Sequence, residues 1–232
     1  NPDWPSNNIE YWRKRTATYE HDAPYGLDGR WRWVMKDMDF SFNADQNWTA
    51  NAYMMNMLTY TTATTNMIEY GIDWPGFLTR KVFGNPIFKT HFITRFADML
   101  NTTFLPERVV NILDELQANL APDMPEHIER WKLIENESVW NENVEVMREF
   151  ANLRPTYQRL HLQNFFNLAG QFFVTLDVQD TTMGGIQINT VDLVPTTPGV
   201  NEQPFPWNGI YFKNVPVKVI AKAKPGYQFS HW

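Results

Sequence analysis

The chain has 232 residues, of which 43% are hydrophobic and 20% are charged, an ordinary balance for a globular protein of one large or two modest domains. Its net charge of -6 and the absence of any Lys/Arg run longer than three residues argue against a nucleic-acid partner. It has no cysteine, which excludes disulfides and thiolate chemistry, and no segment approaches the roughly 20 apolar residues of a membrane span.

The first part of the chain, residues 1–45, is predicted to form turns and short strands around an acidic cluster. An Asp-Gly pair at residues 28–29 marks a tight turn. Residues 31–36 then alternate apolar and polar side chains, as a half-buried strand does. We therefore expect a hairpin that carries Asp37 and Asp39 at its exit.

The middle of the chain is predicted to be helical. Residues 46–82 are rich in Asn and Thr and indicate a loop or a poorly regular helix. Residues 85–168 carry apolar side chains at helical spacing and predict four or five helices in one compact lobe. Helix starts are expected from proline at the first turn or from an N-capping serine, at Pro86, Pro106, Ser138 and Pro155.

Near Gly170 the period changes from helical to strand-like. Strands are expected at residues 172–178, from Ile186 onward and at residues 215–223, with a turn at the two glycines 184–185 and a Pro-rich loop between 195 and 206. The sequence thus predicts a helical domain over residues 1–168 and a small all-β module over 169–232. A module of this size is expected to dock on the helices or to continue beyond Trp232.

The residue order at the start of the chain is the one that kinase-type phosphoryl-transfer enzymes use. Asp3 is followed five residues later by Asn8, and then by a strand that ends in acidic residues. An Asp in this position can accept the proton of an attacking hydroxyl, and the Asn and a later Asp can hold magnesium. On spacing alone, however, capping or turn hydrogen bonds explain most such pairs. The carboxylates of Asp37 and Asp39 repel each other on one strand face, which either a metal ion or a neighbouring cation relieves.

Over about residues 1–168 the chain resembles the spore coat protein H (CotH) kinase-like family of secreted bacterial proteins. The motifs that carry this resemblance are Asp3–Asn8, Trp33–Phe40, Phe92–Asn101, Pro122–Trp131 and Trp140–Ala151, followed by Arg154 and Pro155. The stretch from Pro216 to Trp232 resembles small β-repeat modules of bacterial surface proteins.

The resemblance implies an α+β protein, in which the mostly helical large lobe of an atypical protein-kinase-like fold precedes the small all-β module. It implies a transferase that binds ATP with magnesium and phosphorylates Ser/Thr of a protein substrate outside the cell or at its surface. Carried over residue by residue, Asp3 is the catalytic Asp, and Asn8 and Asp37 hold the metal. Asp39 is a second metal candidate, because residues 39–41 could equally align with the kinase Asp-Phe-Gly motif.

Two family features are absent from this sequence. It has no Gly-rich phosphate loop, and no Lys precedes Asp3, so we expect a large lobe without its small lobe, and an inactive isolated chain. The alternative is a non-catalytic cell-surface scaffold or a carbohydrate- or protein-binding protein. Its carbohydrate-binding form would need exposed aromatic side chains in the β-module, such as Trp207, Tyr211 and Tyr227. The sequence implies no oligomeric state.

Overall fold

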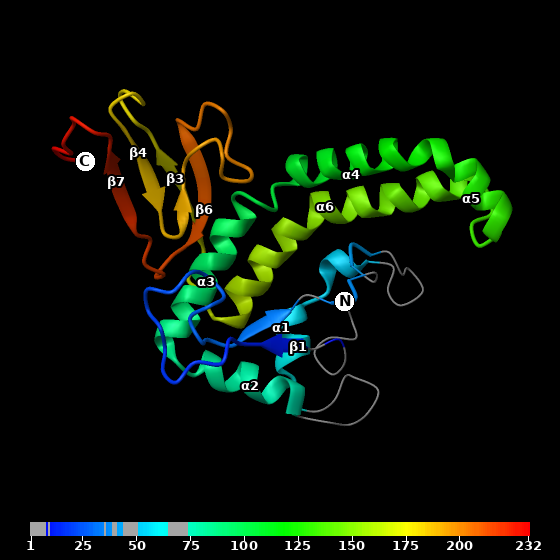
Figure 1. The fold of residues 1–232 in the computed structure, drawn as a ribbon, viewed down its shortest axis with the longest axis horizontal. Coiled ribbons are helices and arrows are strands. Elements are labelled where there is room, and N and C mark those ends of the chain that lie inside the picture. Colours follow the sequence, from blue (N-terminus) through cyan, green and yellow to red (C-terminus); the bar gives the residue numbers. More distant parts are fainter. Residues whose placement is uncertain (1–7, 9, 35, 39–40, 44–50, 65–73) are drawn as a thin grey trace.

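The structure is a computed structural model that describes residues 8, 10–34, 36–38, 41–43, 51–64 and 74–232. It has an α+β fold in which an N-terminal hairpin, a group of helices and a C-terminal β-module follow one another along the chain (Figure 1). In the described part of the chain, no helix combines the length and the apolar character that crossing a membrane requires.

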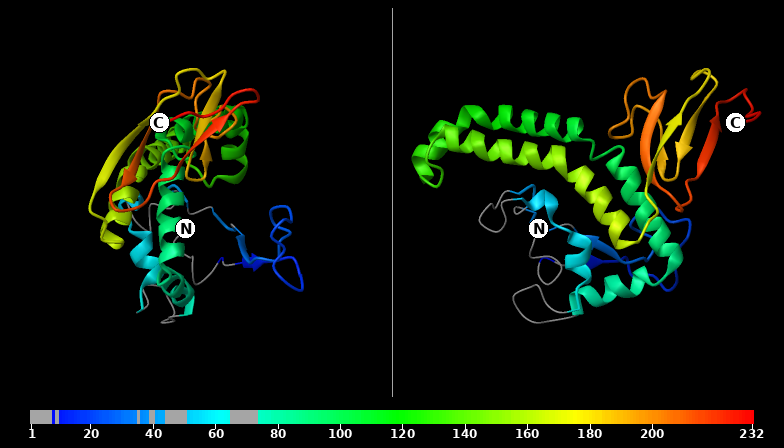
Figure 2. Two further views of the ribbon diagram at one scale, coloured as in Figure 1. Left: turned by 90° about the vertical axis from the view of Figure 1, so that its left-hand side faces the viewer. Right: turned by 180° about the vertical axis from the view of Figure 1, so that it is seen from behind.

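The predicted N-terminal hairpin is confirmed. Strand β1 (Glu10–Trp12) pairs antiparallel with strand β2 (Arg32–Val34), and Glu10 lies opposite Val34. The long connection between the two strands stands out from the helices on one side of the molecule (Figure 2). Asp37 follows β2 at the hairpin exit, and Asp39 lies outside the described residues.

The Asn- and Thr-rich stretch is more regular than its composition predicts. It contains a 3-10 turn η1 (Ala52–Met54), helix α1 (Met57–Thr62) and helix α2 (Trp74–Phe83). Helix α1 begins where it does because the Asn56 side chain accepts hydrogen bonds from the backbone amides of Leu58 and Thr59, at 3.1 and 3.2 Å.

The remaining helices follow in close succession. Their bounds are α3 (Pro86–Leu100), α4 (Pro106–Leu120), the 3-10 turn η2 (Ala121–Asp123), α5 (Met124–Trp131) and α6 (Glu137–Phe165). The starts predicted at Pro86 and Pro106 are confirmed, and both prolines occupy the first turn, where no amide proton is needed.

Helix α6 corrects two predictions. Its cap is Asn136, whose side chain accepts from the amide of Val139 at 3.1 Å, and Ser138 already lies inside the helix. Pro155 does not start a new helix but is buried within α6, which bends along its length (Figure 1). The packing of α6 against its neighbours therefore outweighs the loss of one backbone hydrogen bond at the proline.

The β-module contains two small antiparallel sheets. Strand β3 (Gln171–Leu176) pairs with β6 (Trp207–Phe212), and β4 (Gly184–Ile188) lies between β5 (Val191–Asp192) and β7 (Val219–Ala223). The turn predicted at the two glycines is wrong: both belong to β4, and the turn precedes them, where the Met183 amide donates to the Asp180 carbonyl. Strand β6 was not predicted, because its sequence Trp-Asn-Gly-Ile-Tyr-Phe does not alternate apolar and polar residues and has a glycine in the middle, although its burial alternates from Trp207 to Tyr211.

The helices and the β-module share one hydrophobic core. Ile93, Ala97 and Leu100 of α3 and Leu162 of α6 belong to the same buried cluster as side chains from the β-module, among them Ile186, Ile188, Tyr211 and Phe212. The change from helix to strand falls between Phe165 and Gln171, close to the predicted boundary. The division into two domains, residues 1–168 and 169–232, stays a prediction. Because the two parts share a core, removing one of them tests whether the other folds alone.

Candidate functional site

The structure describes two of the four predicted site residues. Asn8 is half-buried and Asp37 is exposed, whereas Asp3 and Asp39 lie outside the described residues. The backbones of Asn8 and Asp37 are both left-handed, with φ of 52° and 53°, a conformation that Asn and Asp tolerate better than most residues. The chain therefore turns sharply on entering and on leaving the hairpin.

The hairpin register brings these two turns to the same end of the β1–β2 ladder. Glu10, two residues after Asn8, pairs with Val34, three residues before Asp37. Since the strands are antiparallel, the segment that enters β1 and the segment that leaves β2 meet at this end. An ion pair between Lys36 and Glu10 joins the two segments. The role of Asn8 and Asp37 as metal ligands remains a prediction.

The donor chemistry at this end suits magnesium. The Asn8 amide and the Asp37 carboxylate offer the oxygen ligands that magnesium prefers, and Asp37 is open to solvent. Among the residues that the structure describes, no three His, Cys, Asp or Glu side chains gather into a metal site. Any further protein ligand would come from a residue outside that set, such as Asp39, or be replaced by water and phosphate oxygens.

A lysine lies beside the predicted ligands. The Lys36 pKa is raised, chiefly by its hydrogen bond and charge interaction with Glu10 and to a smaller extent by the charge of Asp37. Its ammonium group is therefore positively charged at neutral pH. This end of the hairpin carries both a carboxylate that can hold a cation and a cation that can face a phosphate.

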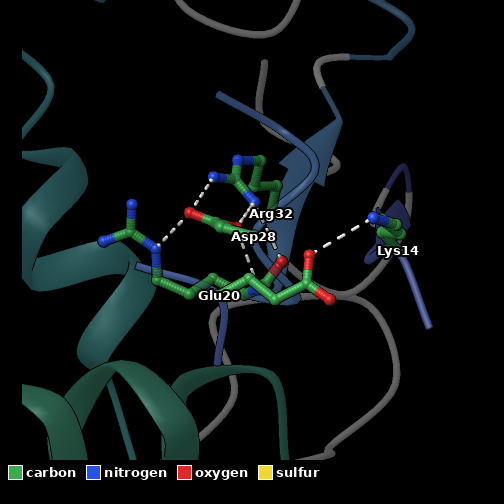
Figure 3. Close-up of polar contacts among 5 residues, drawn as sticks. Lys14, Glu20, Asp28 and Arg32 are labelled. Atoms are coloured by element: carbon green, nitrogen blue, oxygen red, sulfur yellow. Dashed lines mark hydrogen bonds and ion pairs between the residues drawn. The ribbon is translucent and has the colours of Figure 1, made fainter. Parts of the chain in front are cut away.

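The long connection of the hairpin is held by a buried carboxylate. Asp28 is 2% exposed and accepts hydrogen bonds from the guanidinium groups of Arg30 and Arg32, at 2.7 to 2.8 Å (Figure 3). These hydrogen bonds, above all that of Arg32, hold the pKa of Asp28 well below its usual range. A second pair, Lys14 with Glu20 at 3.3 Å, ties the start of the connection to its middle.

One face of the β1–β2 hairpin carries three exposed aromatic side chains. Tyr11 packs edge-to-face on Trp31 and Trp33, with ring centroids 5.3 and 5.5 Å apart, and the three are 58%, 62% and 58% exposed. We call Tyr11, Trp31 and Trp33 the aromatic face. The sequence predicted this strand to be half-buried; the signal that could have pointed to exposed tryptophans is that Arg30 and Arg32 flank Trp31.

Helix α6 supports the segment that follows the hairpin. The buried Arg154 guanidinium donates to the backbone carbonyls of Tyr53 and Met55, at 2.8 and 2.7 Å, and to the Gln158 side chain. Burial lowers the Arg154 pKa to about 10, still well above neutral. Phe42, just beyond the hairpin exit, packs on Phe150 of α6. The predicted site thus lies on a hairpin whose exit is anchored to the longest helix.

Comparison with known proteins supports the kinase-like interpretation. A search of the curated proteins and a search of the solved structures each found no match. A family model described as CotH kinase protein matches residues 1–158, which is more than half of the chain and includes the hairpin and most of α6. The chain therefore belongs to the CotH kinase protein family.

Proposed function

We propose that this chain carries the acidic half of a magnesium-ATP site for phosphoryl transfer to Ser/Thr of a protein substrate outside the cell or at its surface. Asp3 would accept the proton of the substrate hydroxyl. The hydroxyl oxygen of the substrate would then form the new bond to the γ-phosphorus, while the bond from the γ-phosphorus to the β-γ bridging oxygen breaks and ADP leaves. Asn8 and Asp37, or Asp39 in its place, would hold the magnesium.

The observation that carries the proposal is the register of the hairpin. Asn8 and Asp37 are 29 positions apart in numbering, yet β1 and β2 bring their segments to one end of the ladder. Membership of the CotH kinase protein family gives the kinase-type order of these residues a context that spacing alone lacks. Bound magnesium would neutralise charge on the transferring phosphates.

The alternative, a non-catalytic cell-surface scaffold or binding protein, has less support from the β-module. Of the three aromatic residues that a carbohydrate-binding form would need there, Trp207 and Tyr211 are buried in β6 and only Tyr227 is exposed. A scaffold of either kind would bind no nucleotide through Asn8 and Asp37.

The test is magnesium-dependent protection of this chain by ATP against thermal unfolding. A ligand at a hundred times its Kd stabilises the folded state by about 2.7 kcal/mol, so a bound nucleotide raises the melting temperature measurably. Asp37→Asn and Asp39→Asn should each be compared with Asp22→Asn, whose side chain is fully exposed and contacts His21. Loss of protection in one of the first two variants identifies the metal ligand. No shift at millimolar magnesium-ATP, or equal shifts in all variants, would contradict the proposal.

A further inference from the structure

The β1–β2 hairpin has an inverted pattern of burial. Two of its charged side chains turn inward: Asp28 is buried, and the Arg32 side chain is only 12% exposed. Its large aromatic side chains turn outward, onto the aromatic face. A two-stranded hairpin ordinarily gains its stability by burying apolar side chains, and this hairpin is instead fixed by hydrogen bonds and ion pairs around Asp28.

Such a surface has the composition of a protein interface. Contiguous exposed apolar side chains are rare on monomers and mark interaction sites. Trp, Tyr and Arg are the residue types most enriched among the side chains that dominate binding energy, because they combine a large apolar area with a polar group. On the hairpin, the Arg13 guanidinium lies over the Trp31 ring, 4.9 Å from its centroid, and so adds a cation to the aromatic face.

The charge of the hairpin points to the chemistry of the partner. The chain carries a net charge of -6, but residues 10–36 contain six Lys or Arg and four Asp or Glu. Among the described residues, Lys14, Arg30, Arg32 and Lys36 form ion pairs with these acids, whereas neither Arg13 nor Arg15 forms one. The guanidinium group of Arg13 on the aromatic face, and that of the exposed Arg15 two residues further along, can therefore bind carboxylates of another molecule.

We propose that the aromatic face, with Arg13 and Arg15, is a docking surface for an acidic segment of the protein substrate. This inference rests on the proposed function, because it takes the partner to be the protein that receives the phosphoryl group. The ladder is three residue pairs long, with Asn8 and Asp37 beyond its Glu10–Val34 end and Arg13 and Trp31 beyond its Trp12–Arg32 end, so a segment docked along the aromatic face extends toward the proposed transfer site. Apolar side chains of the segment stack on the aromatic face, and its carboxylates pair with the guanidinium groups.

The test is binding of a fluorescent acidic peptide to the full chain, measured by anisotropy without nucleotide. The peptide contains Asp, Glu and Leu but no Ser or Thr, and a matched peptide has Asn and Gln in place of the acids. Trp33→Ala and the double variant Arg13→Glu, Arg15→Glu should each weaken binding of the acidic peptide by about tenfold or more. The neutral peptide should bind poorly to every variant, and added salt should weaken the acidic one.

Helix α5 offers a matched control. There Arg130 lies over the ring of Trp131 at 5.1 Å, and Trp131 is 56% exposed, which repeats the chemistry of Arg13 and Trp31 far from the hairpin. Trp131→Ala and Arg130→Glu should leave peptide binding unchanged. Circular dichroism of each variant verifies that it is folded. If Trp33→Ala unfolds, the double variant Arg13→Glu, Arg15→Glu still tests the inference, because it replaces no aromatic side chain.

Three outcomes would overturn the inference. These are equal affinity for the acidic and neutral peptides, equal losses in the hairpin and α5 variants, and displacement of the acidic peptide by ATP or by a uronic-acid polysaccharide at lower concentration than by unlabelled peptide. Peptide binding and magnesium-ATP protection are measured separately, so failure of the proposed function can be distinguished from failure of this inference. If magnesium-ATP protection is absent while the peptide still binds, the transfer site fails and the docking surface stands as a binding surface only.

Discussion

The carboxylate of Asp98 in helix α3 accepts a hydrogen bond of 3.0 Å from the buried hydroxyl of Tyr211 in strand β6. Asp98 is completely buried, and it also accepts from the Asn189 side chain at 2.9 Å and from the Thr190 amide and hydroxyl, at 3.2 and 2.7 Å. Burial, together with the charge of Asp98, raises the pKa of Tyr211, so its hydroxyl remains a donor. A fully satisfied polar cluster therefore joins the helices to the β-module.

Replacing Asp98 should destabilise the fold strongly. Asp98→Ala leaves buried donors without an acceptor and should lower the free energy of unfolding by about 3 kcal/mol or more, whereas Tyr211→Phe removes one hydrogen bond and should cost about 1 kcal/mol. Urea unfolding measures both. Asp192→Ala is the control, because its pair with Lys222 is exposed and spans 3.7 Å; it should cost less than about 1 kcal/mol. Equal effects of Asp98→Ala and Asp192→Ala would refute this role.

Removing the β-module should unfold the helices that contact it. A chain that ends at Leu168 loses the strands whose side chains share the core with Ile93, Leu100 and Leu162, and so exposes the side of that core that the β-module covers. We expect loss of the near-ultraviolet circular dichroism signal and increased binding of a hydrophobic dye. A chain that ends at Gly226, which lacks only exposed residues, is the control and should remain native. A native fragment 1–168 would show instead that the two predicted domains are independent.

The stability of the fold should fall as the pH is lowered through the ordinary His pKa of 6.5, partly through His161. Burial and the charge of Arg154 lower the His161 pKa, a backbone hydrogen bond with Met54 opposes the shift, and the Nδ1 atom has no hydrogen-bond partner. Because the folded pKa is below the unfolded value, the unfolded chain binds more protons below pH 6.5, and acid favours it.

This contribution can be isolated by mutation. Urea unfolding at about pH 7.5 and about pH 5.5 should show a smaller pH-dependent loss of stability in His161→Gln than in the unchanged chain. His127→Gln, which alters an exposed histidine of α5, should keep the full loss. The same loss in all three proteins would assign the pH dependence to other groups.

Asp28 should control the order of the hairpin connection. Asp28→Asn removes the carboxylate that Arg30 and Arg32 share, and the connection between the strands should loosen. Trypsin should then cleave after the exposed residues 13–15 several times faster than in the unchanged chain, as followed by mass spectrometry. Asp22→Asn changes a fully exposed acid in the same connection and should leave the cleavage rate unchanged. Equal rates in both variants would contradict the prediction.

Local signals in the sequence were enough for much of the fold. The alternation of residues 31–36 indicated a strand before Asp37, the prolines at 86 and 106 indicated two helix starts, and the change of period near Gly170 indicated the passage from helix to strand. Each depends on backbone geometry and capping over a few residues, and such preferences act in almost any context. The ordered motifs of the first 168 residues likewise identified the family.

Only the tertiary structure decided what depends on distant partners. Pro155 stays inside α6 because the surrounding packing holds the helix together, and the Tyr211 hydroxyl can be buried because it donates a hydrogen bond to Asp98 of α3. Trp33 is exposed because Asp28, and not an apolar core, holds the hairpin. Burial follows from which elements meet in space, and a side chain such as Trp has the same apolar area whether it fills a core or faces solvent.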